Sequence, residues 1–394
     1  MSAGDCSTAL QRFTGPEADE VAVLCRPDHE QNPAEQARVA YRALAENLSG
    51  QGASFRDLSG ETLFVRDAGR DLPLILEARS KVLGELGQAG DAPRPVVIGQ
   101  APLEAPAALE LAASVVVPQD RDASSVQDLS VEPSCSCEGC ALSGARLVRL
   151  GDQVSLHASN LYGLGADPAV QVKDMFRVAE QLLAHAGMGF HDVVRTWIHL
   201  RDIGRDYDAL NAARREFFED CGVEQRPAST GVQGIPFSGA HDFSLSLHAM
   251  KSPRPIDIQQ MSTPSLNEAW SYGADFARGL RVVEVNKVVL HVSGTASIDA
   301  AGQTVHVGDL ERQAERMLDN IESLLEGQGT TFGSLMSGVM YLKQPSDALA
   351  VRAICARRGF EGFPYAFVDA PLCRPELLCE AEVIAMLPLK PTGF

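Results

Sequence analysis

The chain carries its clearest acid–base groups near the carboxyl end. Cys373 and Arg374 precede a run that reads as a β-strand, and within this run Glu380 and Glu382 are two residues apart. Because side chains alternate between the two faces of a strand, both carboxylates lie on one face, while the apolar residues between them take the other. Two acids beside an arginine indicate either a functional site or a solvent-exposed acidic face, and the strand alone leaves both interpretations open.

A second group with possible chemistry is the C-x-C-x-x-C run of Cys135, Cys137 and Cys140. Thiolates at such spacing bind zinc or iron–sulfur centres. Three thiols are one ligand short of such a site, and no further His or Cys lies near them in the sequence. We therefore expect no metal and no cofactor, favour a reduced turn or a redox-labile loop, and keep the three cysteines only as secondary metal candidates.

The elements that position these groups form an internal repeat. A glutamine is followed 16 residues later by a glycine at three places, and the residues between are helical in pattern, with apolar side chains at i, i+3 and i+4 spacing. Each glycine suits a left-handed helix C-cap. The three predicted helices cover residues 37–49, 172–184 and 314–326.

Each helix is followed by the same elements. A phenylalanine three residues after the glycine opens a strand rich in β-branched and aromatic residues, and a second helix and a closing strand pair come next. The predicted strands cover 58–66, 193–201 and 335–343. The predicted second helices cover 72–86, 207–218 and 347–358.

This order predicts an α+β fold, in which each unit is a mixed sheet with two helices on one face. The front hairpins differ: we expect a full one in the third unit, at 288–298 and 304–306, and only a short strand at 20–25 in the first. The predicted division is unit one at 8–118, a linker at 119–140, unit two at 141–252, a linker at 253–270, and unit three at 271–390.

The charge and composition of the chain limit the kinds of molecule that it is expected to bind. The 394 residues carry a net charge of −18, which disfavours nucleic acid and anionic membranes. A small anionic substrate then needs a local basic pocket. We find no apolar run long enough to span a bilayer and no signal-peptide pattern at the start, and the nine cysteines are scattered apart from one cluster. We therefore expect a cytoplasmic protein with reduced thiols and no membrane partner.

The repeated unit resembles the Rid (YjgF-type) family across nearly the whole chain. The resemblance rests on the glutamine-initiated helices, the Arg-Pro-Ala turn at 226–228 and the closing Glu-x-Glu strand. It implies chorismate-mutase-like six-stranded sheets, a single-chain pseudotrimer with up to three clefts between units, and a monomer or weak homo-oligomer. In Rid proteins an arginine binds the substrate carboxylate and a glutamate orients water. Unit two keeps Arg226 but has serines in its last strand, whereas unit three keeps the acids but has Tyr365 in place of the arginine.

The segment from Val368 to Glu382 is more closely similar to the Cys-Arg-x-x-Leu-Leu-x-Glu-x-Glu ending of the chorismatases, a tandem Rid-like family. The resemblance implies removal of pyruvate from chorismate in secondary metabolism, with Glu380 as the general acid. By the same resemblance, Cys373 marks the branch that makes 3-hydroxybenzoate rather than a dihydroxycyclohexadiene acid. The general-acid role of Glu380 requires a raised pKa of this residue, caused by burial or by the nearby Glu382.

The remaining candidates are substrate-binding residues. Arg374 and Arg226 are expected to bind carboxylates. The other candidates are Tyr365, Tyr272, Gly294 and Thr295, the last two because 293–298 is similar to a chorismatase hairpin segment. Two alternatives stay open: an enamine/imine hydrolase or hydrolase of another small acid, and a non-catalytic small-ligand-binding protein.

Overall fold

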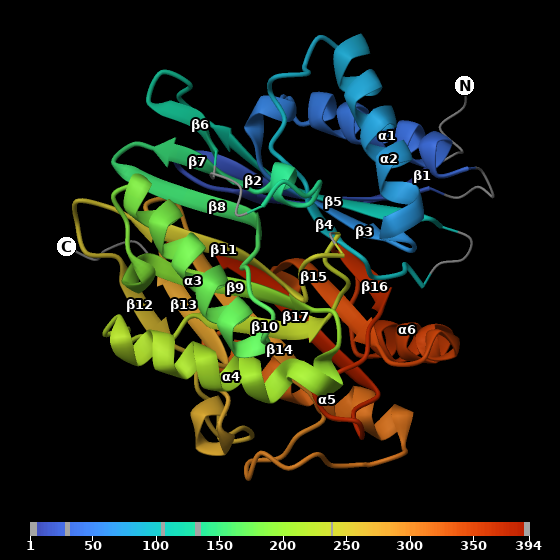
Figure 1. The fold of residues 1–394 in the computed structure, drawn as a ribbon, viewed down its shortest axis with the longest axis vertical. Coiled ribbons are helices and arrows are strands. Elements are labelled where there is room, and N and C mark those ends of the chain that lie inside the picture. Colours follow the sequence, from blue (N-terminus) through green and yellow to red (C-terminus); the bar gives the residue numbers. More distant parts are fainter. Residues whose placement is uncertain (1–5, 28–31, 104–106, 131–134, 238, 390–394) are drawn as a thin grey trace.

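The computed structural model describes residues 6–27, 32–103, 107–130, 135–237 and 239–389, which fold as three consecutive units. Each unit is a mixed sheet with two helices on one face, as the sequence predicts (Figure 1). In the first unit the strand order is β1-β2-β5-β3-β4. Its elements are β1 (Cys6–Thr14), β2 (Ala18–Pro27), α1 (Pro33–Gly50), β3 (Leu58–Val65), α2 (Ala68–Glu85), β4 (Val96–Ile98) and β5 (Leu109–Pro118).

The other two units have six-stranded sheets. The second has the order β10-β9-β11-β8-β7-β6 and the third β12-β13-β14-β17-β15-β16. The second unit consists of β6 (Ser124–Ser130), β7 (Gly144–Leu150), β8 (Gln153–Leu161), α3 (Pro168–His185), β9 (Val193–Leu200), α4 (Ile203–Asp220), β10 (Ala228–Gln233) and β11 (Phe243–Lys251). The third consists of β12 (Asp257–Gln260), β13 (Gly279–Val283), β14 (Val288–Ala296), α5 (Leu310–Glu326), β15 (Leu335–Leu342), α6 (Ala348–Arg357), β16 (Tyr365–Asp369) and β17 (Cys379–Leu387).

Local sequence explains where the first helix of each unit begins and ends. Asn32, Asp167 and Asp309 accept a hydrogen bond from a first-turn N–H of α1, α3 and α5. The glycine that follows each helix has a φ of 70°, 68° or 77°, as expected for left-handed caps. The predicted helices and middle strands are therefore confirmed, with boundaries that differ by a few residues.

Four details differ from the sequence-based expectation. The first unit has a full front hairpin, since β1 pairs along its whole length with β2. In the third unit β14 pairs with the preceding β13, whereas the later segment contributes only a bridge between Ile298 and Thr304. The two predicted linkers contain β6 and β12, which extend sheets two and three. Such edge strands are short and polar, so their apolar alternation is too weak to identify them.

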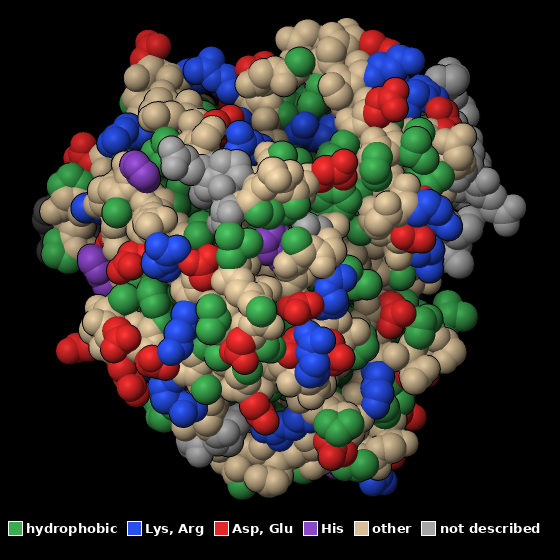
Figure 2. Space-filling view, viewed as in Figure 1, with side chains coloured by type: hydrophobic (Ala, Val, Ile, Leu, Met, Phe, Trp, Pro, Cys, Tyr) green, Lys and Arg blue, Asp and Glu red, His purple; other side chains and the backbone are tan. Residues whose placement is uncertain are grey.

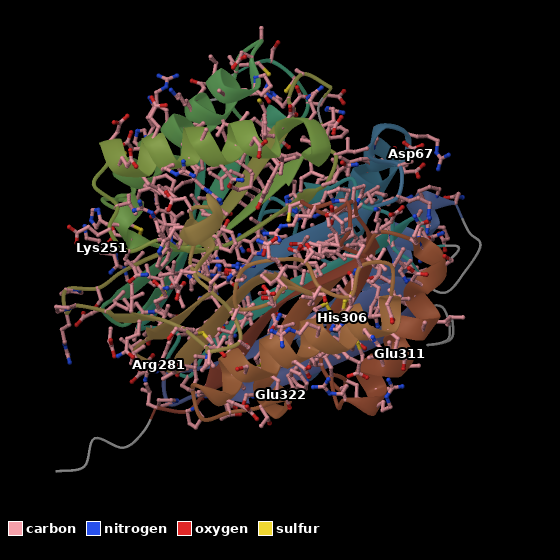
Figure 3. All side chains as sticks on the ribbon, turned by 90° about the horizontal axis from the view of Figure 1, so that it is seen from below. Asp67, Lys251, Arg281, His306, Glu311 and Glu322 are labelled. Carbon is pink, nitrogen blue, oxygen red and sulfur yellow. The ribbon has the colours of Figure 1, made fainter. Side chains whose placement is uncertain are left out.

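The helices lie on the outside, and the uncovered faces of the sheets meet at the centre (Figure 1). Figure 3 shows this from below, with helix α5, which carries Glu311 and Glu322, on the outer side of the third sheet. Each sheet buries one face against its own helices in a separate apolar core. The other faces enclose a central cavity of about 270 Å³, lined by residues of all three units.

Buried polar contacts join the units at this centre. The Lys287 ammonium lies 2.6 Å from a carboxylate oxygen of Glu20 in unit one and 2.6 Å from one of Glu284. The Asn286 amide accepts hydrogen bonds from two N–H groups of the β1–β2 turn and donates to the carbonyl of Ala18. Groups of this kind are buried only when paired, so they fix how the units dock.

The outer surface shows acidic and basic side chains interspersed (Figure 2). No helix among the described residues has the length and apolar character needed to cross a membrane. On the face shown in Figure 2, acidic side chains are dispersed among basic ones rather than gathered in one block.

Candidate functional site

A cleft of about 700 Å³ lies where unit two meets unit three. Its walls come from α4 and β10 of unit two, and from β14, the start of β17 and the segment before β13 of unit three. Glu380, Cys373, Arg374 and Gly294 all line it, so the structure brings together four of the residues singled out in the sequence. Its volume is in the range of small-molecule sites.

Glu380 occupies a buried position in this cleft. It lies on β17 between Ala296 of β14 and Tyr341 of β15, and its side chain is directed away from the helix-covered core. The residue is 5% exposed, and no hydrogen bond from its carboxyl group is found among the described residues. Burial raises the pKa of Glu380 to about 8, and the Glu382 charge adds to this, whereas Arg278 and Arg374 act in the opposite direction. The carboxyl group is therefore protonated near neutral pH and able to donate a proton.

Gly294 makes room for this carboxyl group. It lies at an irregularity of β14, between the paired positions of Val292 and Thr295. A Cβ atom at this position would overlap Oε1 of Glu380. The Gly294 N–H donates to the Thr230 hydroxyl of unit two at 3.0 Å, so the same residue also holds the two walls of the cleft together.

Two buried arginines supply positive charge. The guanidinium groups of Arg214 on α4 and Arg278 before β13 lie 5.5 Å and 5.7 Å from the centre of the Phe276 ring. Arg214 also donates to Asn211 Oδ1 at 2.7 Å, and Arg278 donates to the carbonyl of Asn267 at 3.0 Å. Both groups line the cleft and are held in fixed positions before any ligand binds.

Sequence reasoning did not select Arg214 or Arg278 as site residues. A signal for Arg214 was present, because it lies on the same face of α4 as the apolar residues Leu210 and Phe218. A charged residue at a core-facing helix position requires a partner or a function. The signal for Arg278 was its place two residues after Phe276, in the aromatic segment 270–278.

Cys373 and Arg374 lie at the rim of the same cleft. Arg374 donates to the carbonyl of Gly302 at 2.7 Å and contacts the Thr304 hydroxyl at 3.4 Å. Burial raises the pKa of Cys373 to about 12, with a further contribution from Glu380 and opposing ones from Arg374 and a hydrogen bond with Tyr207. The thiol is thus neutral at any ordinary pH and is not a nucleophile or base.

Glu382 lies on the same face as Glu380, as predicted, but it points into the central cavity instead. One oxygen accepts a hydrogen bond from Arg195 at 2.7 Å and the other accepts one from the Trp197 indole at 2.8 Å. Arg195 also donates to the Thr230 hydroxyl at 2.6 Å. Glu382 therefore joins units two and three behind the cleft, where its charge contributes to the raised pKa of Glu380.

The other candidates lie elsewhere. Arg226 donates to Asp275 at 2.7 Å, stacks on Phe218 and lines a separate pocket, so Arg226 and Glu380 do not share a cleft. Tyr365 packs in an aromatic cluster of the third core. The Thr295 hydroxyl donates to the carbonyl of Ser293 at 2.8 Å and does not line the cleft. The Tyr272 side chain is outside the described part of the structure.

Strand pairing identifies the positions that match Glu380 in the other units. Glu380 pairs with Tyr341, Ser244 with His199, and Glu110 with Phe64. Unit two has therefore lost the acid, as the sequence suggested. Unit one keeps it, but Arg26 lies 3.5 Å from Glu110, whose side chain is wholly buried. Of the two acids at this position, Glu380 lines the described cleft between units two and three, and Glu110 does not.

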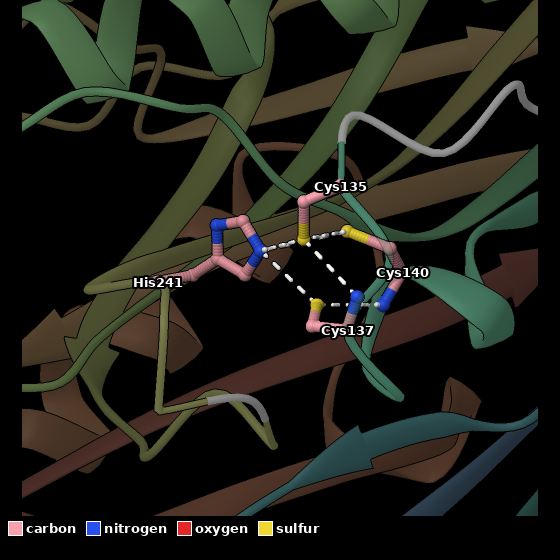
Figure 4. Close-up of side chains that lie close together, drawn as sticks. All are labelled: Cys135, Cys137, Cys140 and His241. Atoms are coloured by element: carbon pink, nitrogen blue, oxygen red, sulfur yellow. Dashed lines mark hydrogen bonds between the residues drawn. The ribbon is translucent and has the colours of Figure 1, made fainter.

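The three clustered cysteines lie away from this cleft. Cys135, Cys137 and Cys140 converge on His241, which comes from the loop before β11 (Figure 4). No pattern in the sequence connects His241 with them, because about 100 residues separate the two segments. Only the tertiary structure supplies this fourth group.

Comparison with known proteins agrees with the fold and the repeat. Residues 144–236, which lie within unit two, match the family model described as endoribonuclease L-PSP. The chain is 27% identical over 238 residues to a 3-hydroxybenzoate synthase of Streptomyces hygroscopicus, covering 54% of this chain and 67% of that protein. It is 26% identical over 222 residues to a chorismatase of Streptomyces rapamycinicus, covering 50% and 64%.

A solved structure extends the likeness to the full length. The crystal structure of a chorismatase superposes with a TM-score of 0.58 over 98% of this chain and 99% of that one, at 16% sequence identity. At this identity the match establishes the fold. With its three sheets, its L-PSP match and these relatives, the chain has a tandem Rid-like fold and is similar to the chorismatases and the 3-hydroxybenzoate synthase.

Proposed function

We propose that this chain is a chorismatase-like enzyme that removes pyruvate from chorismate in the cleft between units two and three. The observation that carries the proposal is a buried carboxyl group, Glu380, whose pKa is raised to about 8 and which faces a cleft lined by arginines. A protonated acid beside fixed positive charge suits an anionic substrate that must be protonated on carbon. The named relatives are a 3-hydroxybenzoate synthase and chorismatases, which supports this substrate.

Substrate binding is assigned to the arginines. Chorismate carries two carboxylates, and Arg214 and Arg278 present two guanidinium groups near the Phe276 ring. Arg374 lines the same cleft. Guanidinium groups bind carboxylates in a planar, two-point manner. This local charge offsets the overall charge of −18, which by itself repels a dianion.

The proposed reaction begins when Glu380 gives its proton to the methylene carbon of the enolpyruvyl group. The ether carbon of the enolpyruvyl group then becomes electron-poor. A nucleophile can attack either this carbon or the ring carbon that carries the ether oxygen. Attack by the ring hydroxyl on the ring carbon releases pyruvate and leads to 3-hydroxybenzoate without net consumption of water. Attack by water gives pyruvate and a dihydroxycyclohexadiene acid. Neither route calls for a cofactor.

The direct test is incubation of the purified chain with chorismate, followed by measurement of pyruvate and of aromatic products. We expect pyruvate and 3-hydroxybenzoate in equal amounts, in keeping with Cys373. Folded protein that releases no pyruvate above background contradicts the proposal. Parallel incubation with an imine or enamine substrate tests the ordinary Rid activity, which the separation of Arg226 from Glu380 disfavours.

A further inference from the structure

The cluster of three cysteines and one histidine has the arrangement of a metal centre. Nε2 of His241 lies 3.4 Å from each of the three sulfur atoms, and the sulfurs of Cys135 and Cys140 are 3.4 Å apart (Figure 4). All four donor atoms lie within 4.8 Å of one another. Four donors around one point, from two distant segments, define a small tetrahedral cage.

These spacings fit one particular ion. In a tetrahedral site with Zn–S near 2.3 Å and Zn–N near 2.05 Å, neighbouring sulfurs are about 3.8 Å apart and sulfur and nitrogen about 3.6 Å apart. The observed 3.4 Å separations are close to these values. Three cysteines and one histidine with no open position form one of the ligand sets of structural zinc.

The surroundings orient the histidine for this role. The Nδ1 atom of His241 lies 2.9 Å from the carbonyl oxygen of Gly163, which accepts a hydrogen bond and so requires the proton to be on Nδ1. The lone pair of Nε2 is then directed at the three sulfurs. The ring is 1% exposed and stacks on Tyr162 at 4.8 Å. A ligand histidine commonly has its second nitrogen bound to a carbonyl in this way.

The backbone supports thiolates at the same place. The N–H of Cys137 donates to the sulfur of Cys135, and the N–H of Cys140 donates to the sulfur of Cys137, both at 3.4 Å. N–H groups that donate to sulfur are typical of the surroundings of metal-bound cysteines.

We propose that Cys135, Cys137, Cys140 and His241 bind one structural Zn²⁺ ion, which fastens the segment before β7 to the loop before β11. None of the four lines the Glu380 cleft, so the ion has no part in the proposed reaction. Its role is at the contact between units one and two. There the Asn160 side chain donates to the carbonyls of Leu142 and of Pro95, which lies in unit one.

The test is metal analysis of the purified full-length chain by mass spectrometry. We expect one zinc per chain, which falls at least fivefold in His241→Ala and in Cys137→Ser. Cys221→Ser, which changes an exposed cysteine elsewhere, keeps the wild-type zinc content. A zinc chelator lowers the Tm of the wild-type protein but leaves the Tm of His241→Ala unchanged.

A second measurement does not depend on variants that fold. In the native wild-type chain, we expect Cys135 and Cys137 to resist alkylation until chelator is added, although both are only half-buried. Folded protein from zinc-supplemented medium with less than 0.1 zinc per chain contradicts the proposal. A disulfide between Cys135 and Cys140, seen as a mass lower by two hydrogens, or iron in place of zinc also overturns it.

Discussion

At the scale of single residues, burial decides the chemistry of the candidate site. Glu380 and Glu382 are two positions apart on one strand face, yet one faces a cleft without a hydrogen-bond partner among the described residues and the other accepts from Arg195 and Trp197. The first carboxyl group is thereby held protonated, and the second links two units. Sequence spacing placed both on one face, but it did not distinguish their roles.

The raised pKa of Glu380 predicts opposite effects of Glu380→Gln on activity and stability. Pyruvate release falls by about 10²–10⁴-fold, because glutamine donates no proton to carbon. In the wild type, activity declines as pH rises through about 8, where the acid loses its proton. Pyruvate assays across pH measure both effects.

The raised pKa of Glu380 also determines how the stability of the protein changes with pH. The folded-state pKa of about 8 lies above the reference value of 4.5, so the folded state holds this proton more tightly. The stabilising contribution is therefore full below pH 4.5 and is lost as pH rises to 8. Above pH 8, the unfolding free energy of Glu380→Gln exceeds that of the wild type by about 1 kcal/mol or more, so the variant also melts at a higher temperature. Equal melting of the two at every pH contradicts the pKa shift, and Glu326→Gln, an exposed acid of the same unit, is the control.

Gly294→Ala tests the packing of the acid. Because a Cβ atom at this position overlaps the Glu380 carboxyl group, the acid must move. We expect at least a tenfold loss in kcat/KM and a loss of stability of about 1–3 kcal/mol. Gly333→Ala, where the nearest atom is 3.7 Å from the new Cβ, is the matched control. Full activity in Gly294→Ala shows that the carboxyl position is not critical.

Cys373→Ala tests whether this residue directs the product. Since the pKa of its thiol is about 12, the residue acts as a neutral group beside the substrate and not as a nucleophile. We expect pyruvate release within about tenfold of the wild type, but a larger share of the dihydroxycyclohexadiene acid. Product analysis by chromatography decides this. An unchanged product ratio shows that Cys373 does not determine which of the two products forms.

At the scale of elements, the cleft depends on two segments that belong to different units. Helix α4 supplies Arg214 from its core-facing side, and β17 supplies Glu380 from the face that its own helices leave uncovered. The irregularity of β14 at Gly294 lies between them and bonds to Thr230 of β10. A cleft built in this way is as rigid as the sheets that form it.

Arg214→Gln tests the contribution of α4 to substrate binding. Loss of a charge-assisted pair costs about 1.5–3 kcal/mol, so we expect KM to rise about 10–100-fold. Arg226→Gln is expected to change KM less than about threefold, because Arg226 pairs with Asp275 in another pocket. Steady-state kinetics on folded variants measure the KM of Arg214→Gln and of Arg226→Gln. Arg177→Gln, on the surface of α3, is the control. A larger effect at Arg226 reverses this assignment.

At the scale of the whole molecule, the three junctions between units have diverged. The position of Glu380 is Ser244 in unit two, and in unit one it is Glu110 beside Arg26. The first change removes the acid, and the second places a positive charge against it. Tandem units free each junction to change separately, because a substitution in one copy leaves the other two unaltered.

Lys287→Met tests how the units are held together. Removal of the ammonium leaves the carboxylates of Glu20 and Glu284 buried without their cation. We expect a loss of about 3–5 kcal/mol in unfolding free energy, measured by denaturant titration. Lys173→Met, which breaks an exposed pair with Glu216, should cost about 1 kcal/mol or less. Similar losses in the two variants contradict a special role for the central pair.

Several features followed from the sequence alone. Helices, middle strands and the threefold repeat were predictable because they depend on periodicity within a few turns or one strand length. The common face of Glu380 and Glu382 followed from the two-residue period of a strand. The edge strands β1, β6 and β12 were missed because an edge strand alternates weakly between apolar and polar residues.

Only the tertiary structure decided which junction is open and which side chains share it. Arg214 and Arg278 meet at Phe276 from two units, Arg226 is directed into a different pocket, and His241 completes a cluster whose other members lie about 100 residues earlier. The physical reason is that clefts form between units, where contacts join residues distant in sequence. No local period records such contacts, so the strand carrying Glu380 was visible in the sequence, whereas its pocket was not.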